Sequence, residues 1–174
     1  MTDLVHLPPA PKGFTSATQV SWARLAQAPH FAHRPHRRTG RRLAGVKYEN
    51  QVQEMLLAAH GASYLPSPWL QFSTPQGLKW CQPDGLLFDL DHGAITIVEV
   101  KYQHTTDAWW QLRRLYEPVL QKIFPSHLWQ FHTLELVKWY DQAILWPEPL
   151  RLVANPTEAK SLPFNTTGVH IWKP

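Results

Sequence analysis

The clearest hydrophobic pattern in the chain is segment 95–102, ITIVEVKY, in which six of the eight residues are β-branched or aromatic. Such residues favour a strand. Because side chains alternate between the two faces of a strand, Ile95, Ile97, Glu99 and Lys101 share one face. A strand that is apolar on both faces is typical of the middle of a sheet. The pattern therefore raises the question of why one face ends in a carboxylate and an ammonium.

Hydrophobic periodicity predicts helices and further strands around this segment. Apolar positions recur at helical spacing over 44–60, and Gly61 is a suitable end for that helix. Segment 105–124 predicts a second helix, with Thr105 or Thr106 as its N-cap and a kink at Pro118. Between them, turns at 74–77 and 91–93 predict two hairpins, with strands in WLQFS, LKWCQ, GLLFDL and AITIVEVKY. The sequence FHTLELVKWY predicts a further strand.

The two ends of the chain differ from this middle part. Residues 1–44 are rich in proline and basic residues, and within them 16–28 predicts one short helix with Ser16 as its N-cap. From Pro147 onward, five prolines predict an extended tail, with a strand at VHIW. The order of elements predicts an α/β fold, a mixed sheet flanked by helices. We expect a basic arm at 1–44 and a domain at 45–174 that includes the tail.

Composition narrows the class of protein. A hydrophobic content of 44% with nine tryptophans predicts a packed core and not a disordered chain. The single cysteine, Cys81, excludes an internal disulfide. No apolar run approaches the ~18 residues of a membrane helix, and the first residues lack the pattern of a signal peptide. We therefore expect a cytoplasmic protein without a membrane partner.

Basic charge is concentrated towards the N-terminus. Residues 1–48 hold eight Lys or Arg and one acid, whereas the remaining residues hold nine basic and twelve acidic groups. This asymmetry favours a polyanion partner, whose phosphates are neutralised without reading sequence. The alternative is a solvated leader. The candidate nucleic-acid-binding residues are Arg34, Arg37, Arg38, Arg41, Arg42, Lys47, Gln111 and Arg114.

The charged pair at 99 and 101 has two candidate partners. On its own, the pair could neutralise itself at the exposed end of the strand, because buried unpaired charges are costly. Asp84 lies in a Pro-Asp-Gly turn sequence, yet the returning hairpin would bring it opposite residues 99–101. Glu49 falls at the edge of the apolar stripe of the 44–60 helix and needs a partner there, for which Lys101 or a backbone amide would suffice.

Pro83-Asp84 followed by Glu99-Val100-Lys101, with a helical glutamate before them, resembles the PD-(D/E)XK phosphodiesterase superfamily, which has the restriction endonuclease-like fold. The resemblance covers about residues 45–137 and includes the order of elements. It implies hydrolysis of DNA with Mg²⁺ or Mn²⁺. Asp84, Glu99 and the Val100 carbonyl would be metal ligands, and Glu49 would help to hold this metal or a second one. Lys101 would orient the attacking water and offset charge in the transition state.

Several activities are compatible with that resemblance. The small size and the basic arm favour a structure-specific or resolvase-like endonuclease, which could make paired cuts as a homodimer. Exonucleases, restriction enzymes and transposon end-cleaving nucleases share the fold. Some exonuclease-like members carry a glutamine and a tyrosine on the following helix. Gln111 and Tyr116 are five residues apart, one more than usual in that subgroup. Two other hypotheses are a binding module without activity and a structural protein in which Glu99 and Lys101 form only an ion pair.

Overall fold

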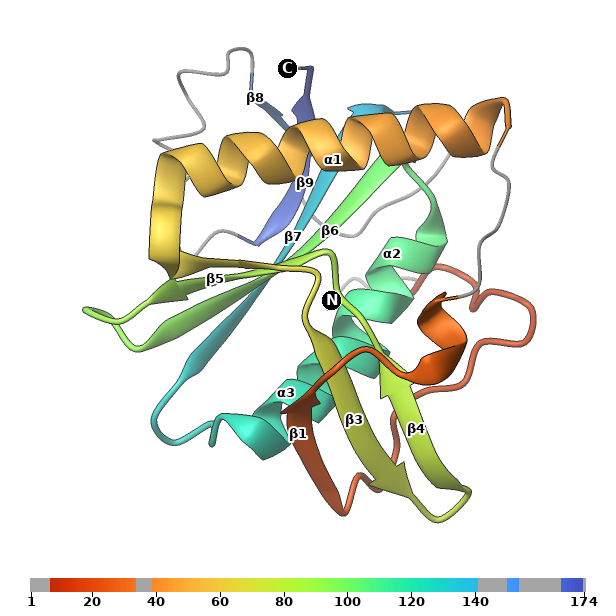
Figure 1. The fold of residues 1–174 in the computed structure, drawn as a ribbon, viewed down its shortest axis with the longest axis vertical. Coiled ribbons are helices and arrows are strands. Elements are labelled where there is room, and N and C mark those ends of the chain that lie inside the picture. Colours follow the sequence, from red (N-terminus) through yellow and green to blue (C-terminus); the bar gives the residue numbers. More distant parts are fainter. Residues whose placement is uncertain (1–6, 34–38, 141–149, 154–166, 174) are drawn as a thin grey trace, which may run out of the picture.

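The computed structural model describes residues 7–33, 39–140, 150–153 and 167–173. It is a mixed α/β structure, as the sequence predicts, but it has two sheets where the sequence predicts one (Figure 1). The larger sheet has the order β2-β5-β6-β7-β9-β8. Its strands are β2 (Tyr64–Pro66), β5 (Gly85–Asp89), β6 (Ala94–Gln103), β7 (Gln130–Trp139), β9 (Gly168–Trp172) and β8 (Leu150–Val153).

The smaller sheet has the order β1-β3-β4 and consists of β1 (Trp22–Ala26), β3 (Trp69–Thr74) and β4 (Gly77–Cys81). The helices are α1 (Arg41–His60), α2 (Thr106–Gln111) and α3 (Glu117–Ile123). A π-helical turn η3 (Leu112–Tyr116) joins α2 to α3, and two short 3₁₀ helices are η1 (His30–His33) and η2 (Gly61–Ser63).

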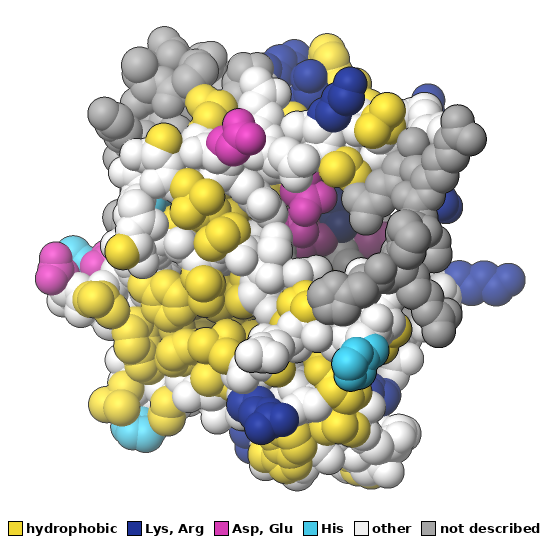
Figure 2. Space-filling model, viewed as in Figure 1, with side chains coloured by type: hydrophobic (Ala, Val, Ile, Leu, Met, Phe, Trp, Pro, Cys, Tyr) yellow, Lys and Arg dark blue, Asp and Glu magenta, His cyan; other side chains and the backbone are white. Residues whose placement is uncertain are grey.

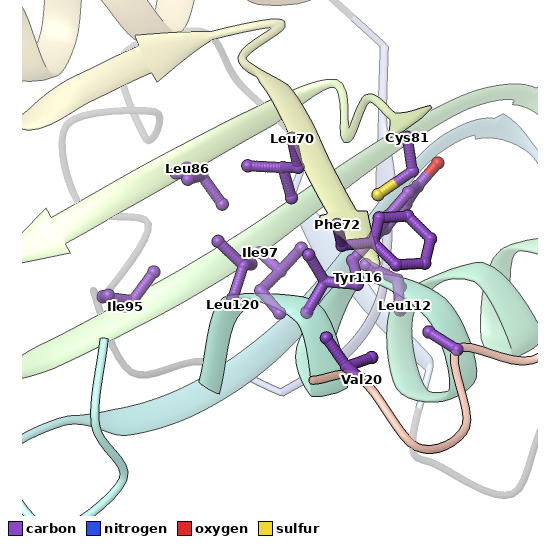
Figure 3. Packing of buried hydrophobic residues seen from close by; sticks show 12 residues of the cluster. Val20, Leu70, Phe72, Cys81, Leu86, Ile95, Ile97, Leu112, Tyr116 and Leu120 are labelled. Atoms are coloured by element: carbon purple, nitrogen blue, oxygen red, sulfur yellow. The ribbon is translucent and has the colours of Figure 1, made fainter. Parts of the chain in front are cut away.

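The two faces of the larger sheet are covered by different helices. On one face, Tyr48, Val52 and Leu56 of α1 pack against Val98 and Val100 of β6. On the other face, the α2–α3 segment and the small sheet enclose a second core. Figure 3 shows side chains from β3, β6 and the helical segment pointing towards one another in this core. Each fully buried aliphatic side chain stabilises the fold by about 1.5–3 kcal/mol.

Strand β6 lies in the interior of the larger sheet. It pairs antiparallel with β5 and parallel with β7, and the chain crosses between β6 and β7 through α2 and α3. This interior position accounts for an unbroken run of buried residues from Ala94 to Val100. Parallel neighbours need such a helical crossover, whereas the antiparallel pair needs only the turn at 90–93.

Most of the predicted elements are present. α1 ends at Gly61, which has a positive φ of 53°. Both hairpins form, FHTLELVKWY lies largely within β7, and VHIW lies within β9. Strand β8, in the proline-rich tail, was not foreseen.

The prediction of a helix over 16–28 is wrong. Residues 22–26 form strand β1, which pairs antiparallel with β3, with Trp22 opposite Ser73 and Ala26 opposite Trp69. The segment lies on the edge of β3, where main-chain hydrogen bonds to a neighbouring strand outweigh a weak local helix propensity. Ala17 and Val20, just before it, are buried in the core beside α3.

The break expected at Pro118 takes the form of the π-helical turn that precedes it. A proline has no N–H, so Pro118 cannot donate to the carbonyl of Arg114 four residues earlier. That carbonyl accepts instead from the backbone N–H of Ala17, at 2.8 Å. The N-terminal segment is thereby fixed to the helix at the point where the proline leaves an acceptor.

Candidate active site

Asp84 lies against the end of β6, where the sequence predicts it. Its Oδ2 accepts a hydrogen bond from the backbone N–H of Val100, at 2.6 Å. The ladder between β5 and β6 ends with Gly85 opposite Val98, so the edge of β6 beyond Val98 is open to this carboxylate. Since the N–H and C=O of a strand residue point to the same edge, the carbonyl of Val100 also faces the side of Asp84.

The backbone of Asp84 is held by three donors. Its carbonyl accepts from the Ser67 N–H at 2.9 Å, the Tyr64 hydroxyl at 3.2 Å and Gln53 Nε2 at 3.3 Å. The next residue must be small, because a Cβ at Gly85 would lie 2.3 Å from the Tyr64 ring. These contacts fix the main chain, so that the Asp84 carboxylate is directed towards β6.

Glu99 and Lys101 form an ion pair on the face of β6 that meets the α2–α3 segment. Lys101 Nζ donates to Glu99 Oε1 at 2.5 Å. The Glu99 side chain is 3% exposed and that of Lys101 is 25% exposed, so the lysine reaches solvent and the glutamate does not. The second oxygen, Glu99 Oε2, is buried and makes no hydrogen bond to the described part of the chain.

The pKa values of the site report a surplus of negative charge. Burial, and then repulsion from Glu49, raise the pKa of Asp84 to about 6, against the opposing effects of the Val100 amide and Lys101. Burial, and then repulsion from Asp84, raise the pKa of Glu99 to about 7. Burial alone would lower the pKa of Lys101, but the neighbouring carboxylates outweigh it and raise that pKa. The carboxylates therefore compete for one ammonium, and additional positive charge would stabilise their ionised forms.

Glu49 belongs to the same cluster. It is half-buried on α1, and its charge contributes to the raised pKa values of both Asp84 and Tyr64. Figure 2 shows acidic side chains in a hollow below α1, with a lysine or arginine side chain deeper behind them. The structure thus brings together the four residues whose side chains the sequence analysis selected, namely Asp84, Glu99, Lys101 and Glu49.

The residues fit a hard divalent cation in their chemistry, but their side chains are not arranged around one. Within the described residues, no three His, Cys, Asp or Glu side chains are grouped closely enough to hold a metal ion. Instead, Lys101 neutralises Glu99 and the Val100 amide binds Asp84. The donor set is carboxylates with a main-chain carbonyl, which are oxygen ligands of the kind that Mg²⁺ prefers. The buried, unbonded oxygen of Glu99 is a ready ligand atom.

A buried contact between a histidine and a glutamate next to this cluster was not foreseen. His104 Nδ1 lies 2.9 Å from Glu135 Oε1, and both side chains are fully buried. Glu135 is the partner of Glu99 in the parallel ladder between β7 and β6, so both carboxylates lie on the same face. Lys101 helps to lower the pKa of Glu135, which burial raises. The only signal for this pair in the sequence was a charged residue inside the apolar run of β7.

Tyr116, which the sequence analysis considered together with Gln111, lies near Glu99 and Asp84. Burial, followed by the charges of Glu99 and Asp84, raises its pKa well above the usual value. It ends the π-helical turn, in which hydrogen-bonded residues are five apart, as in the bond from the Glu117 N–H to the Leu112 carbonyl. The turn thus takes up the extra residue between Gln111 and Tyr116.

The remaining candidate DNA-binding residues are scattered. Arg41, Arg42 and Lys47 are exposed on α1, whereas Gln111 is half-buried on α2. Arg114 is exposed, and its guanidinium lies 5.9 Å from the centre of the Trp109 ring. Arg34, Arg37 and Arg38 lie outside the described residues.

Comparison with known proteins finds no relative. No protein family, curated protein or solved structure matches this chain. Among the described residues, no helix combines the length and the apolar character needed to cross a membrane.

Proposed function

We propose that this chain is a metal-dependent deoxyribonuclease of the PD-(D/E)XK superfamily, with a restriction endonuclease-like core. The observation that carries the proposal is the 2.6 Å hydrogen bond from the Val100 amide to Asp84, because it sets the Pro-Asp turn against the Glu99-Val100-Lys101 strand end. The order of α1, the β5–β6 hairpin, the α2–α3 crossover and the parallel strand β7 also supports it. A two-residue ion pair alone would require neither Asp84 nor Glu49 beside it.

In this proposal, Asp84, Glu99 and the Val100 carbonyl would hold Mg²⁺ or Mn²⁺, and Glu49 would assist from α1. A bound cation would polarise the phosphate and lower the pKa of a bound water. The ammonium of Lys101 leaves Glu99 and donates to the attacking water and to the phosphate oxygens, where it offsets negative charge in the transition state. Its partial exposure gives it the freedom to do so.

A structure-specific endonuclease is the activity we favour, because the concentrated basic residues in 1–48 favour binding to phosphates without reading the base sequence. An exonuclease-like activity is the second candidate. It is favoured by the π-helical turn, which compensates for the long spacing between Gln111 and Tyr116 and leaves Tyr116 beside Glu99.

The test is a cleavage assay on supercoiled plasmid, linear duplex, single strand and a four-way junction, each with Mg²⁺, Mn²⁺ or EDTA. We expect metal-dependent cleavage that falls about 100-fold or more in Lys101→Ala, because one charge-stabilising donor is lost. Lys122→Ala is the matched control, since Lys122 is an exposed lysine on α3 outside the site.

Two results of this assay would contradict the proposal. One is cleavage that persists in EDTA or is unchanged in Lys101→Ala, which would assign the activity to other groups. The other is binding of DNA without cleavage under all metal conditions, which would favour the module without activity. Among positive results, nicking of plasmid supports an endonuclease and degradation of linear substrates alone supports the exonuclease-like alternative.

A further inference from the structure

The outer face of the small sheet is aromatic. Leu70 and Phe72 of β3 point into the core, so Trp69 and Gln71 point outwards. The registers with β1 and β4 place Arg24 and Trp80 on either side of Gln71 on that face. Trp22 of β1 belongs to the same face, because it lies two residues before Arg24.

Two of the rings on this face are exposed to solvent, and Trp69 and Trp80 are half-buried. Trp22 is 43% exposed, and Phe31 of η1, which lies over the sheet, is 54% exposed. The Phe31 ring stands edge-on to both Trp69 and Trp80, with centroid distances of 6.1 Å in each case. The solvent face of an antiparallel sheet is ordinarily polar, so exposed rings gathered there indicate a binding surface. We call Trp22, Arg24, Phe31, Trp69 and Trp80 the aromatic platform.

The segments that form the platform carry basic residues and no acidic ones. Segments 4–48 and 55–83, which contain all three strands of the small sheet and η1, include no Asp or Glu. On the platform itself, the Arg24 guanidinium lies 5.9 Å from the centre of the Trp22 ring, and its Nε donates to Gln71 at 2.8 Å. In Figure 2, hydrophobic side chains and a lysine or arginine side chain lie together at the bottom of the view, over these strands. A partner that offers both flat rings and negative charge matches this surface.

Strands β3 and β4 of the small sheet both lie next in sequence to segments of the candidate active site. Trp69 is two residues after Ser67, whose N–H donates to the Asp84 carbonyl at 2.9 Å. Trp80 is four residues before Asp84 itself. A nucleotide strand stacked on these rings would therefore lead towards Asp84. At ~3.3 Å per residue, a five-residue strand spans about 17 Å, which is room for two or three stacked bases.

We propose that the aromatic platform binds single-stranded DNA by stacking its bases, and that it feeds this strand to the Asp84 site. The delivery of the strand to the Asp84 site rests on the proposed nuclease function. The binding of single-stranded DNA does not. Bases in a duplex are already stacked on each other and cannot lie on tryptophan rings, so the platform selects single strands or single-stranded portions of branched DNA. Arg24 contacts the phosphates beside the stacked bases.

The test measures binding without cleavage. Fluorescence anisotropy of a labelled oligo(dT) of about 12 nucleotides is recorded in EDTA, with the full chain and its Trp22→Ala, Trp22→Phe and Phe31→Ala variants. We expect both alanine variants to bind about fivefold more weakly or worse, and Trp22→Phe to recover most of the affinity, because stacking needs a ring. Leu90→Ala is the control, since Leu90 is 75% exposed in the turn between β5 and β6.

The outcomes separate this inference from the proposed nuclease. Equal affinity of all variants, or an equal loss for duplex DNA, would overturn the platform even if the chain cleaves DNA. Tighter binding of oligo(U) than of oligo(dT) would overturn the assignment to DNA. Weaker binding of oligo(dT) by the alanine variants, together with no cleavage of any substrate, would support the aromatic platform and contradict the proposed nuclease function.

Discussion

Strand β5 has an aspartate at each end, and the two have different surroundings. Each carboxylate accepts a main-chain hydrogen bond, Asp84 from the Val100 N–H at 2.6 Å and Asp89 from the His92 N–H at 3.2 Å. Asp89 also pairs with the imidazole of His92 at 2.7 Å, and that side chain is 73% exposed. Asp84 instead lies near Glu49 and Glu99, which are negatively charged when ionised.

The comparison of Asp84 with Asp89 separates the contacts that a hairpin turn requires from those that it does not require. The contacts of Asp89 with His92 join residues three apart, and they are those of an ordinary hairpin turn. The contact of Asp84 joins residues 16 apart, and its neighbours oppose its ionisation. A fold gains no stability by gathering carboxylates at one point. The concentration of charge at the Asp84 end is therefore the part of the hairpin that requires a functional explanation.

The largest difference between the two aspartates is expected in the rate of DNA cleavage. Asp84→Asn should reduce metal-dependent DNA cleavage by about 100-fold or more, because an amide is a poor replacement for a charged ligand of a hard cation. Asp89→Asn should leave the rate within about twofold, since it lies outside the site. Initial rates on the preferred substrate measure both. Equal losses in the two variants would mean that the two ends of β5 do not differ in function.

The next difference concerns how the free energy of unfolding depends on pH. The pKa of Asp84 is raised to about 6 and that of Glu99 to about 7, so the folded state binds more protons than the unfolded chain between pH 5 and 8. The stabilisation is complete below the ordinary pKa of about 4 and is lost as the pH rises through these raised values. Without metal, the free energy of unfolding should fall by roughly 2–4 kcal/mol between pH 5 and 8.

Denaturant titrations in EDTA at several pH values measure this slope. Asp84→Asn should flatten it, because the variant removes one titrating group and the repulsion that acts on Glu99. Asp89→Asn should leave the slope unchanged. A slope of opposite sign, with stability rising towards pH 8, would contradict the charge surplus at the site.

A divalent cation should restore the free energy of unfolding that is lost between pH 5 and 8. At pH 8, Mg²⁺ at about 100 times its dissociation constant should stabilise the fold by about 2.7 kcal/mol, which corresponds to a rise in Tm of about 5–10 °C. At pH 5 the rise should be small, because protons occupy the carboxylates. Thermal melts of the natural chain and of Asp84→Asn provide the measurement, and an equal rise in the variant would place the cation elsewhere.

The smallest effect is expected at the other end of β5. Asp89→Asn weakens a contact in which the His92 side chain is 73% exposed and the Asp89 side chain 12% exposed. Pairs with a partner open to solvent contribute about 0–1 kcal/mol. Chemical denaturation should therefore show a loss of less than about 1 kcal/mol. A loss of several kcal/mol would show that the turn does more than close the hairpin.

The features that could be predicted from the sequence are local ones. The hairpin of β5 and β6 joins residues that are close along the chain, so its turn and alternation sufficed to bring Asp84 opposite residues 99–101. The helix that ends at Gly61 and the position of Glu49 at the edge of its apolar face also follow from local periodicity.

The features that were missed depend on distant contacts. Strand β1 forms because β3, more than 40 residues later, offers an edge to pair with. The contact of Tyr116 with the site depends on a π-helical turn that no periodicity of 3.6 residues predicts. The contact of His104 with Glu135 requires the parallel alignment of β6 with β7. Local patterns contain no information on any of these three pairings.

The central claim is that Asp84 and Glu99 bind a divalent cation. It is tested most directly by a crystal structure of the chain soaked in Mn²⁺, with anomalous diffraction to locate the metal. The account predicts an anomalous peak about 2.1 Å from oxygens of Asp84, Glu99 and the Val100 carbonyl, with the Lys101 ammonium displaced from Glu99. A soaked crystal without a peak at this position, in which Lys101 still pairs with Glu99, would contradict it.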